Sequence, residues 1–481
     1  MDFVDRAPQR PSCRYFFSQG GCRFGSECRF SHETRGNSQW QSHDHHFSFR
    51  EFVSSYACAG VRGSNNSTSS SGGGESERGV SASYDAAASR ASTVGDLNET
   101  TITVMSYNVL ADAYANKHRR ELYTRVPTTC LSWKNRVELL VQEVGHWRPT
   151  IVCMQEVDHF RDLEIKLEAQ GYVGRFLQRT NDRPDGLAMF WKVDVFGREP
   201  VVAEEVMFAG LNLRDNVAQV YRLRMVSGRG GGRDDASDNP FELVVSNIHV
   251  LFNPKRGDIK LGQVRVLVDR IAQESQGGAI PVIMCGDWNS APFSGVYDFV
   301  SNGRLDFMER DRRTVSGQIA GNRAKSVNSN GTGSSTLYKA PKPWKIDEIA
   351  TALGDPMLSF GADMPSTAVL SHDMDLTSSY KHVLGSEPQF TTAHDKYIGT
   401  VDYIFFSSSP SPSLPSPPSS PPSSLPGGEE RRRGKIGRWH IEPQSVLLPP
   451  PTSAVLPQGL PRNWFGSDHI SLLVSFCCSY K

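Results

Sequence analysis

Residues 281–290 read PVIMCGDWNS, and this stretch decides the fold because a wholly apolar run ends abruptly in polar groups. The apolar part, at 280–285, is typical of a strand that is buried on both faces. Gly286 allows a close backbone approach just before the polar groups. Asp287 and Asn289 stand two positions apart, so on an extended chain they point to the same side. The stretch predicts a reactive group at the end of a central strand.

The same pattern recurs in five other places, each with one or two polar residues inside or just after an apolar, β-prone run. These islands are SYNVL around Asn108, QEVD around Glu156, SNIHV around His249, TVDYIF around Asp402, and SDHIS around Asp468 and His469. Any one of these residues, taken alone, is more simply a turn former, a loop acid or a core histidine. Six such islands in one chain instead predict a cleft that collects acids, amides and imidazoles at strand ends.

Apolar runs and helical periodicities alternate along the chain from Ile102 onward. We expect strands at 101–107, 151–155, 186–192, 217–226, 241–248, 280–285, 400–406 and 470–476, and helices at 132–146, 158–170, 259–276 and 294–301. Some strands alternate with helices, whereas others pair as hairpins. This mixture favours an α/β fold with two packed sheets and outer helices, a four-layer sandwich, over a purely parallel sheet.

Composition divides the 481 residues into three parts. We expect a small metal-binding module at 1–36, a flexible Ser/Gly-rich linker at 37–99, and a catalytic domain at 100–481 with disordered inserts near 227–239, 312–341 and 407–434. The 52 basic residues equal the 52 acidic residues, so no global attraction to nucleic acid is indicated. No secretory signal or membrane span is visible, which predicts a cytoplasmic or nuclear protein.

The N-terminal module carries Cys13, Cys22, Cys28 and His32 in the spacing C-x8-C-x5-C-x3-H. Three thiolates and one imidazole complete a closed tetrahedral Zn²⁺ shell of the structural kind. The spacing resembles the CCCH zinc-finger family. A segment this short cannot bury a sufficient core, so we expect Zn²⁺ binding to drive its folding.

Aromatic and basic side chains alternate between these zinc ligands. Tyr15, Phe16, Phe24 and Phe30, with Arg23, are expected to stack on unpaired bases, which makes single-stranded RNA the predicted partner. The alternative is that two or three of these rings pack on the zinc core or on a protein partner.

Three residues of the larger part have the chemistry of a divalent-metal site. Glu156 closes the buried run IVCMQ and is the expected metal carboxylate, since Mg²⁺ takes one or two carboxylates and several waters. Asp468 is expected in the outer shell of the same ion. Asn108 ends the run TITVMSY, where its amide can orient water or phosphate. We expect Mg²⁺ here, with Mn²⁺ as the alternative.

The remaining residues have the chemistry of proton transfer and phosphate binding. One of Asp287 and Asn289 is expected to orient the attacking water while the other holds a phosphate oxygen. His469 is expected to contact phosphate as an imidazolium that Asp402 orients and charges. His249 is expected to donate to the phosphate.

Residues from about 101 to 478 resemble the endonuclease/exonuclease/phosphatase superfamily in SYNVL, QEVD, GDWNS, TVDYIF and SDHIS, which occur in the family's order. Longer segments, such as NIHVLFNPKRGDIKLGQVRVL and GDWNSAPFSGVYDFV, resemble its carbon catabolite repressor-type branch, which includes poly(A) deadenylases, nocturnin and the Angel proteins. The resemblance implies the same metal and phosphate roles for the residues above. It also implies substrate contacts for Asn253 and Lys255, and places Asp185 at the cleft edge.

The resemblance implies an Mg²⁺-dependent 3′–5′ exoribonuclease of the poly(A)-specific deadenylase type that releases nucleoside 5′-monophosphates from mRNA tails. A 2′,3′-cyclic phosphatase or a dinucleotide 2′-phosphatase would use the same residues. A non-catalytic RNA-binding adaptor is the alternative from another class, and loss of a metal or base residue would be its sign.

Two departures from the branch bear on these expectations. No leucine-rich repeats precede the nuclease-like part, so membership of the core deadenylation complex is doubtful. Trp288 stands where a smaller apolar residue or Phe is common, and we expect it to alter the base pocket.

Overall fold

The computed structural model describes residues 50–54, 99–226, 240–318, 343–360, 362–407, 437–456 and 458–481. The chain divides into two units, Met1–His46 and Phe47–Lys481. All described residues belong to the second unit. The zinc ligands and the aromatic residues of the predicted finger lie outside the described residues.

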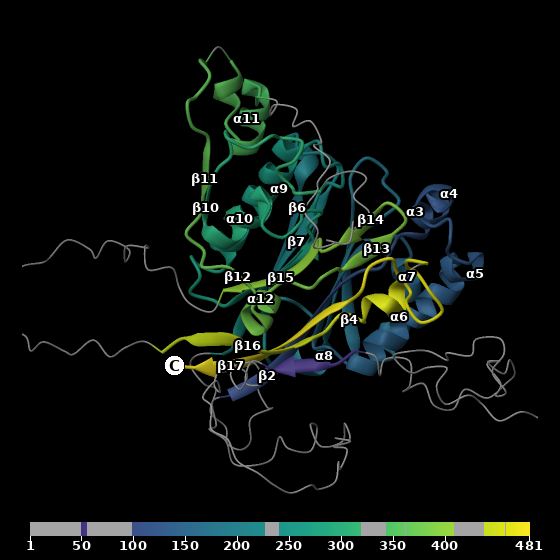
Figure 1. The fold of residues 1–481 in the computed structure, drawn as a ribbon. Helices are drawn as coiled ribbons and strands as arrows, with labels where there is room; N and C mark the ends of the chain where they lie inside the picture. The colour runs from purple at the N-terminus through teal and green to yellow at the C-terminus, as the bar shows by residue number, and fades with distance from the viewer. Residues whose placement is uncertain are drawn as a thin grey trace, which may run out of the picture. The chain divides into compact units, whose positions relative to one another are not determined.

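The first large sheet of the second unit has seven strands (Figure 1). In spatial order they are β1 (Phe52–Ser54), β16 (Trp439–Leu447), β17 (Leu472–Tyr480), β2 (Glu99–Asn108), β3 (Ile151–Val157), β5 (Gly186–Lys192) and β4 (Tyr172–Gln178). Only β2 and β3 pair in parallel, and the other neighbours are antiparallel. The carboxyl ends of β2 and β3 therefore lie side by side.

The second large sheet has six strands. In spatial order they are β12 (Thr377–Ser378), β15 (Asp402–Ser407), β9 (Val282–Asp287), β8 (Glu242–His249), β7 (Val217–Arg224) and β6 (Val202–Met207). Again one pair is parallel, β8 with β9, and its register places His249 opposite Asp287. On the other side of β9, Asp402 of β15 also lies opposite Asp287.

The two sheets pack face to face, and helices cover their outer faces (Figure 1). Ile102, Cys153 and Ile404 belong to the apolar core between the sheets. A second core joins the first sheet to α6 (Trp133–Trp147) and α7 (Phe160–Glu168). A third joins the second sheet to α9 (Gly257–Glu274), α10 (Gly295–Asn302) and α11 (Ile346–Leu353). Two sheets between two helical layers form the predicted four-layer α/β sandwich.

Shorter elements complete the described part of the chain. They are the hairpins β10 (Arg304–Asp306) with β11 (Val369–Ser371) and β13 (Thr392–His394) with β14 (Tyr397–Gly399), the helices α3 (Asp112–Lys117), α4 (Arg119–Leu122), α5 (Thr128–Leu131), α8 (Val193–Phe196), α12 (Ser379–Leu384) and α13 (Thr452–Val455), and the 3₁₀ turns η4 (Phe208–Leu211) and η5 (Pro356–Ser359). No described helix combines the length and the apolar character needed to cross a bilayer.

Two segments differ from the expected domain organisation. Within the segment expected to be a flexible linker, residues 52–54 form β1 and extend the first sheet by pairing with β16. Within the insert expected near 312–341, the described residues 312–318 pack on the domain, where Val315 and Ser316 are buried. In both cases a polar stretch contains a few residues that make specific tertiary contacts.

Candidate active site

The polar residues at the strand ends of both sheets meet in one place. Asn108, the last residue of β2, donates from its amide Nδ2 to Glu156 Oε1 at 3.2 Å and to Asp287 Oδ2 at 3.0 Å. Glu156 belongs to the first sheet and Asp287 to the second, so the Asn108 amide bridges the two sheets. The side-chain oxygen of Asn108, Oδ1, accepts from the backbone amide of Leu110, which fixes the orientation of the side-chain amide.

Glu156 reaches the site through an irregularity at the end of β3. The pairing of β3 with β5 shifts register between Met154 and Val157, and Glu156 adopts a left-handed backbone conformation with φ 56°. This conformation is uncommon for a residue other than glycine and often marks a functional position. Glu156 Oε2 accepts from the backbone amide of Ala111 at 3.1 Å.

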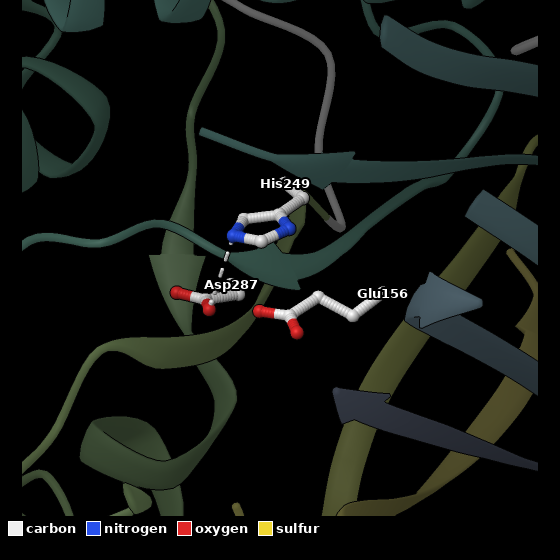
Figure 2. A group of neighbouring side chains, drawn as sticks. All are labelled: Glu156, His249 and Asp287. Carbon is white, nitrogen blue, oxygen red and sulfur yellow. Dashed lines mark ion pairs between the residues drawn. The ribbon is translucent and has the colours of Figure 1, made fainter. Parts of the chain in front are cut away.

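Asp287 stands at the centre of the group. Figure 2 shows its carboxylate beside the His249 ring, with the Glu156 carboxylate directed toward it. His249 Nε2 lies 3.5 Å from Asp287 Oδ2, and the backbone amide of Asn289 donates to Asp287 Oδ1 at 2.9 Å. The close approach of these groups depends on the parallel register of β8 and β9.

His469 and Asp402 form the predicted pair. His469 Nδ1 lies 2.8 Å from Asp402 Oδ2, and both side chains are buried. The other ring nitrogen, Nε2, lies 3.9 Å from Asp287 Oδ2. The carboxylate of Asp402 thus orients the imidazole so that its second nitrogen faces the centre of the site.

Burial and like charges raise the pKa of both central carboxyl groups. Burial is the main cause for Asp287, the Asp402 charge adds to it, and the pKa of Asp287 rises to about 7. Burial also raises the pKa of Glu156 to about 8, with further contributions from Asp468 and Asp185. A divalent cation bound at either group would displace its proton and lower that pKa, because carboxyl groups bind metal ions in the deprotonated form.

The two histidines are driven to opposite protonation states. Burial lowers the pKa of His249 well below its usual value, and the charge of Arg179 lowers it further, so His249 is neutral. Burial would also lower the pKa of His469. The adjacent Asp402, with Asp468 and Asp287, outweighs that effect and holds the pKa of His469 well above its usual value. His469 is therefore the cationic donor of the pair near neutral pH.

Asn289 is held by buried polar groups. Its Nδ2 donates to the carbonyl of Val250 at 3.0 Å, and its Oδ1 accepts from Gln318 Nε2 at 3.2 Å. Lys260, which is fully buried, donates to the backbone carbonyl of Asn289 and to Gln318 Oε1. Lys260 and Gln318 thus fix the loop that follows β9.

The donor set fits a divalent cation. Ligand atoms of Glu156, His249 and Asp287 lie within 4.8 Å of one another, and so do those of Asp287, Asp402 and His469. The buried Oδ1 atoms of Asp402 and Asp468 have no hydrogen-bond partner among the described residues. Clustered carboxylates with unsatisfied buried oxygens are the hard ligands that such ions prefer. Glu156 is the carboxylate that would hold the ion, and Asp287, from the other sheet, lies beside it.

Asp468 lies at the same end of the sheets but is bound differently. Its Oδ2 accepts from the Tyr123 hydroxyl at 2.9 Å, which leaves Oδ1 as the oxygen that is free to act toward the site. Ser467, one residue earlier, donates to the carbonyl of Asn108 at 2.7 Å and accepts from the backbone amide of His469 at 3.1 Å. The SDHIS loop is therefore tied directly to the end of β2.

The residues expected at the substrate lie in two different environments. Asn253 and Lys255 are exposed, and Asn253 Oδ1 accepts from the backbone amide of Lys255 at 2.9 Å. Asp185, expected at the cleft edge, is instead fully buried. It accepts from the Tyr114 hydroxyl at 2.7 Å and pairs with Arg179 at 3.2 Å, so its oxygens hold these side chains in place.

The expectation that Trp288 alters a base pocket is wrong. Its side chain is 1% exposed, belongs to the core under α9 and α10, and meets Phe405 edge to face at 5.1 Å. Side chains alternate across an extended chain, so the residue between Asp287 and Asn289 points away from both of them into the core.

Sequence reasoning missed several residues that shape the site. They are Tyr114, Tyr123, Arg179, Lys260 and Gln318. The basic group of Lys260 within the helical pattern 259–276 was a usable signal, because a lysine on an apolar helix face needs a buried partner. The others lie in loops or short helices, where the sequence carries no periodic signal.

Comparisons with known proteins identify the family of this chain. The model of the endonuclease/exonuclease/phosphatase family matches residues 105–469, and the CCCH-type zinc finger model matches residues 11–33. Carbon catabolite repressor protein 4 homolog 3 of Arabidopsis thaliana is 37% identical over 385 residues, which cover 78% of this chain and 74% of the relative. Protein angel homolog 2 of Danio rerio is 30% identical over 391 residues, which cover 78% of this chain and 64% of that protein.

One solved structure extends the likeness to three dimensions. The crystal structure of ANGEL2, a 2′,3′-cyclic phosphatase, in complex with adenosine-2′,3′-vanadate superposes with a TM-score of 0.58 at 26% identity, covering 79% of this chain and 96% of that one. Enzymes of this family are hydrolases, typically dependent on a divalent metal ion, and CCCH fingers bind zinc. The chain carries a CCCH finger and belongs to the endonuclease/exonuclease/phosphatase family.

Proposed function

We propose that this protein is an Mg²⁺-dependent 3′–5′ exoribonuclease that shortens mRNA tails, with poly(A) as the substrate, and releases nucleoside 5′-monophosphates. The observation that carries the proposal is the convergence of Glu156, Asp287 and the Asp402–His469 pair from two sheets. The relationship to the carbon catabolite repressor-type proteins supports the choice of substrate.

The arrangement assigns a role to each group. Asp287, with a pKa raised to about 7, is suited to accept a proton from the attacking water. His469, held protonated by Asp402, donates to the charge that develops on the phosphate. Neutral His249 is a hydrogen-bond donor or acceptor toward the same group. Glu156 would hold Mg²⁺, with Asp468 in its outer shell, and the bound ion would neutralise charge at the phosphate.

The finger supports RNA as the partner, since CCCH modules hold single-stranded RNA with their aromatic rings. In this proposal the zinc-bound finger recruits the RNA, and the second unit cleaves it. The location consistent with this activity is the cytoplasm or the nucleus.

A 2′,3′-cyclic phosphatase is the second candidate, because the ANGEL2 structure that superposes on this chain has that activity. Its substrate would be the 3′-terminal cyclic phosphate of an RNA, hydrolysed by the same side chains. A dinucleotide 2′-phosphatase would also use them. The complete set of acids, amides and imidazoles in one cluster argues against a non-catalytic adaptor.

Product analysis tests the proposal. The purified full-length protein with Mg²⁺ would receive 5′-labelled and 3′-labelled RNA with and without an A tail, RNA ending in a 2′,3′-cyclic phosphate, and NADPH. We expect a ladder of shortened 5′-labelled RNA and release of AMP from the tail. Removal of the cyclic phosphate alone, with no shortening, would establish the second candidate.

Two variants test whether the activity belongs to this site. Asp287→Ala and Glu156→Ala are expected to abolish turnover, a loss of at least about 10²-fold, with an unchanged circular dichroism spectrum. Full activity in either purified variant would refute the site. Asp182→Asn is the control, since Asp182 is exposed.

A further inference from the structure

A basic pocket lies beside the candidate active site. Four arginines, one aspartate and two uncharged residues line it: Arg179, Arg183, Arg214, Arg256, Asp215, Leu251 and Asn253. With Asp185 and Asp258, which pair with Arg179 and Arg256, the four guanidinium groups meet three carboxylates, so the net positive charge favours an anion. None of the catalytic roles assigned above uses Arg183, Arg214 or Arg256.

Ion pairs hold most of these arginines in place without neutralising all of them. Arg183 Nη2 lies 2.7 Å from Asp215 Oδ2, and Arg256 Nη2 lies 2.7 Å from the buried Asp258. Arg214 has no acidic partner within the part of the chain that the structure describes, and its side chain is exposed. Arg214 also has a left-handed backbone, with φ 72°. A fixed rim with one unpaired guanidinium is suited to a phosphate, because Arg presents a planar fork of donors.

The pocket neighbours the candidate active site. Arg179 links the two, since it lines the pocket and its charge lowers the pKa of His249. Leu251 follows His249 by two residues. The Asn216 amide, next to Asp215, donates to the His249 carbonyl at 2.7 Å. A polyanion whose end occupies the active site would therefore reach the pocket with its next phosphates.

An exposed aromatic ring accompanies the arginines. Phe252 stands between the lining residues Leu251 and Asn253, and 65% of it is accessible to solvent. Exposed aromatic rings beside basic groups are typical of single-stranded nucleic-acid sites, where bases stack while the backbone is held by charge. A polyglutamate chain, by contrast, has no aromatic base to stack on this ring.

We propose that the arginine pocket binds the backbone phosphates of the RNA chain upstream of the cleaved bond, with Arg214 as a phosphate ligand and Phe252 as a stacking platform. This inference rests on the proposed function only in taking a polynucleotide as the substrate. The pocket makes the length of the chain, beyond its terminal nucleotide, part of substrate recognition.

Direct binding tests this site independently of turnover. The probe is a fluorescein-labelled dodecamer of adenylate with phosphorothioate linkages, which resists cleavage, and all proteins are full-length and carry Cys28→Ser to remove binding by the finger. Arg214→Gln is expected to weaken binding about three- to tenfold. It should also reduce the dependence of log K on log salt by about 0.7, which is the loss of one phosphate contact to a single strand. Phe252→Ala should weaken binding without changing that slope.

Arg198→Gln is the matched control. Arg198 is exposed and follows the Lys192 end of β5. The other end of β5, at Gly186, is the one that lies at the candidate active site. We expect it to bind the dodecamer like the parent. AMP, which has a single phosphate, should bind the parent and the Arg214→Gln variant equally.

Three results would overturn the proposal. One is equal binding of the dodecamer by Arg214→Gln and Arg198→Gln. Another is an equal loss of affinity for AMP, which would make the pocket a mononucleotide site. The third is a twelve-residue polyglutamate peptide that competes as well as the RNA, which would identify a site for acidic protein segments. If the product analysis finds no tail shortening while the Arg214 effect persists, the proposed reaction fails and the binding site stands.

Discussion

The surroundings of each ionisable residue give chemically similar side chains different protonation states. Two histidines lie near Asp287, yet the pKa of His249 is lowered and the pKa of His469 is raised. The difference comes from Asp402, which lies 2.8 Å from His469 Nδ1, whereas His249 Nδ1 has no partner among the described groups. One carboxylate thus decides which imidazole carries a proton.

Neutralising Asp402 should therefore change both rate and pH dependence. Asp402→Asn is expected to lower kcat/KM for RNA about 10²–10⁴-fold. Because the Asp402 charge raises the pKa of His469, its removal lowers that pKa, and the alkaline limb of the kcat/KM profile should move to lower pH. Steady-state rates from pH 6 to 9 measure this shift, with Asp182→Asn as the control. An alkaline limb in its original position would show that His469 does not act as the cation.

Glu156 should make the metal-free protein less stable as the pH rises. Its pKa is about 8 in the folded state against an ordinary value of 4.5, so the folded state binds the proton more tightly. The resulting stabilisation is fully present below about pH 4.5 and is lost as the pH rises through about 8. Over this range, urea denaturation in chelator should show the free energy of unfolding of the parent falling relative to that of Glu156→Gln, which does not titrate. Parallel stability curves would contradict the raised pKa.

At the scale of elements, β1 connects a distant stretch of chain to the candidate active site. Arg50, just before β1, is 2% exposed and donates to Glu143 Oε1 at 3.0 Å and to Ser471 Oγ at 2.8 Å. Ser471 stands two residues after His469, and its Oγ in turn donates to Glu143 Oε1 at 2.6 Å. The segment before the Ser/Gly-rich stretch thereby supports the loop that carries His469.

Removal of the Arg50 side chain should destabilise the domain. Arg50→Ala leaves the buried Glu143 without its cation, which typically costs about 3–5 kcal/mol of free energy of unfolding. The exposed Glu51→Ala is the control and should lie within about 0.5 kcal/mol of the parent. The double variant Arg50→Met, Glu143→Leu should recover part of the loss, because no charge is then left buried. Urea denaturation measures all three, and a loss below about 1 kcal/mol in Arg50→Ala would contradict this structural role of Arg50.

At the scale of the whole molecule, the predicted zinc ligands and the candidate active site belong to separate units. The zinc ligands lie within Met1–His46, and every residue of the candidate active site lies in the second unit. Cys28→Ser removes one of the four zinc ligands and should unfold the finger. We expect KM to rise for RNAs of 30 nucleotides or more, with kcat/KM for an adenylate hexamer unchanged. Equal losses on both substrates would show that the finger acts within the catalytic step.

The central strands of both sheets were predictable because they are buried on both faces and therefore continuously apolar. The predicted runs at 151–155 and 280–285 became β3 and β9 with small shifts of their ends. The edge strands β4 and β6 were not predicted, and neither was β16, which lies next to the short edge strand β1. Their residues alternate or include Pro443, and a strand with one solvated face has a weak signal in the sequence.

The sequence by itself determined which polar groups stand at strand ends, because an apolar run that stops at an acid or amide is a local property. Tertiary structure alone decided that Asn108 touches Asp287, 179 positions away, and that Trp288 turns from the site into the core. It also decided the protonation of the two histidines. Strand register and burial set these outcomes, and both arise only when distant segments pack together.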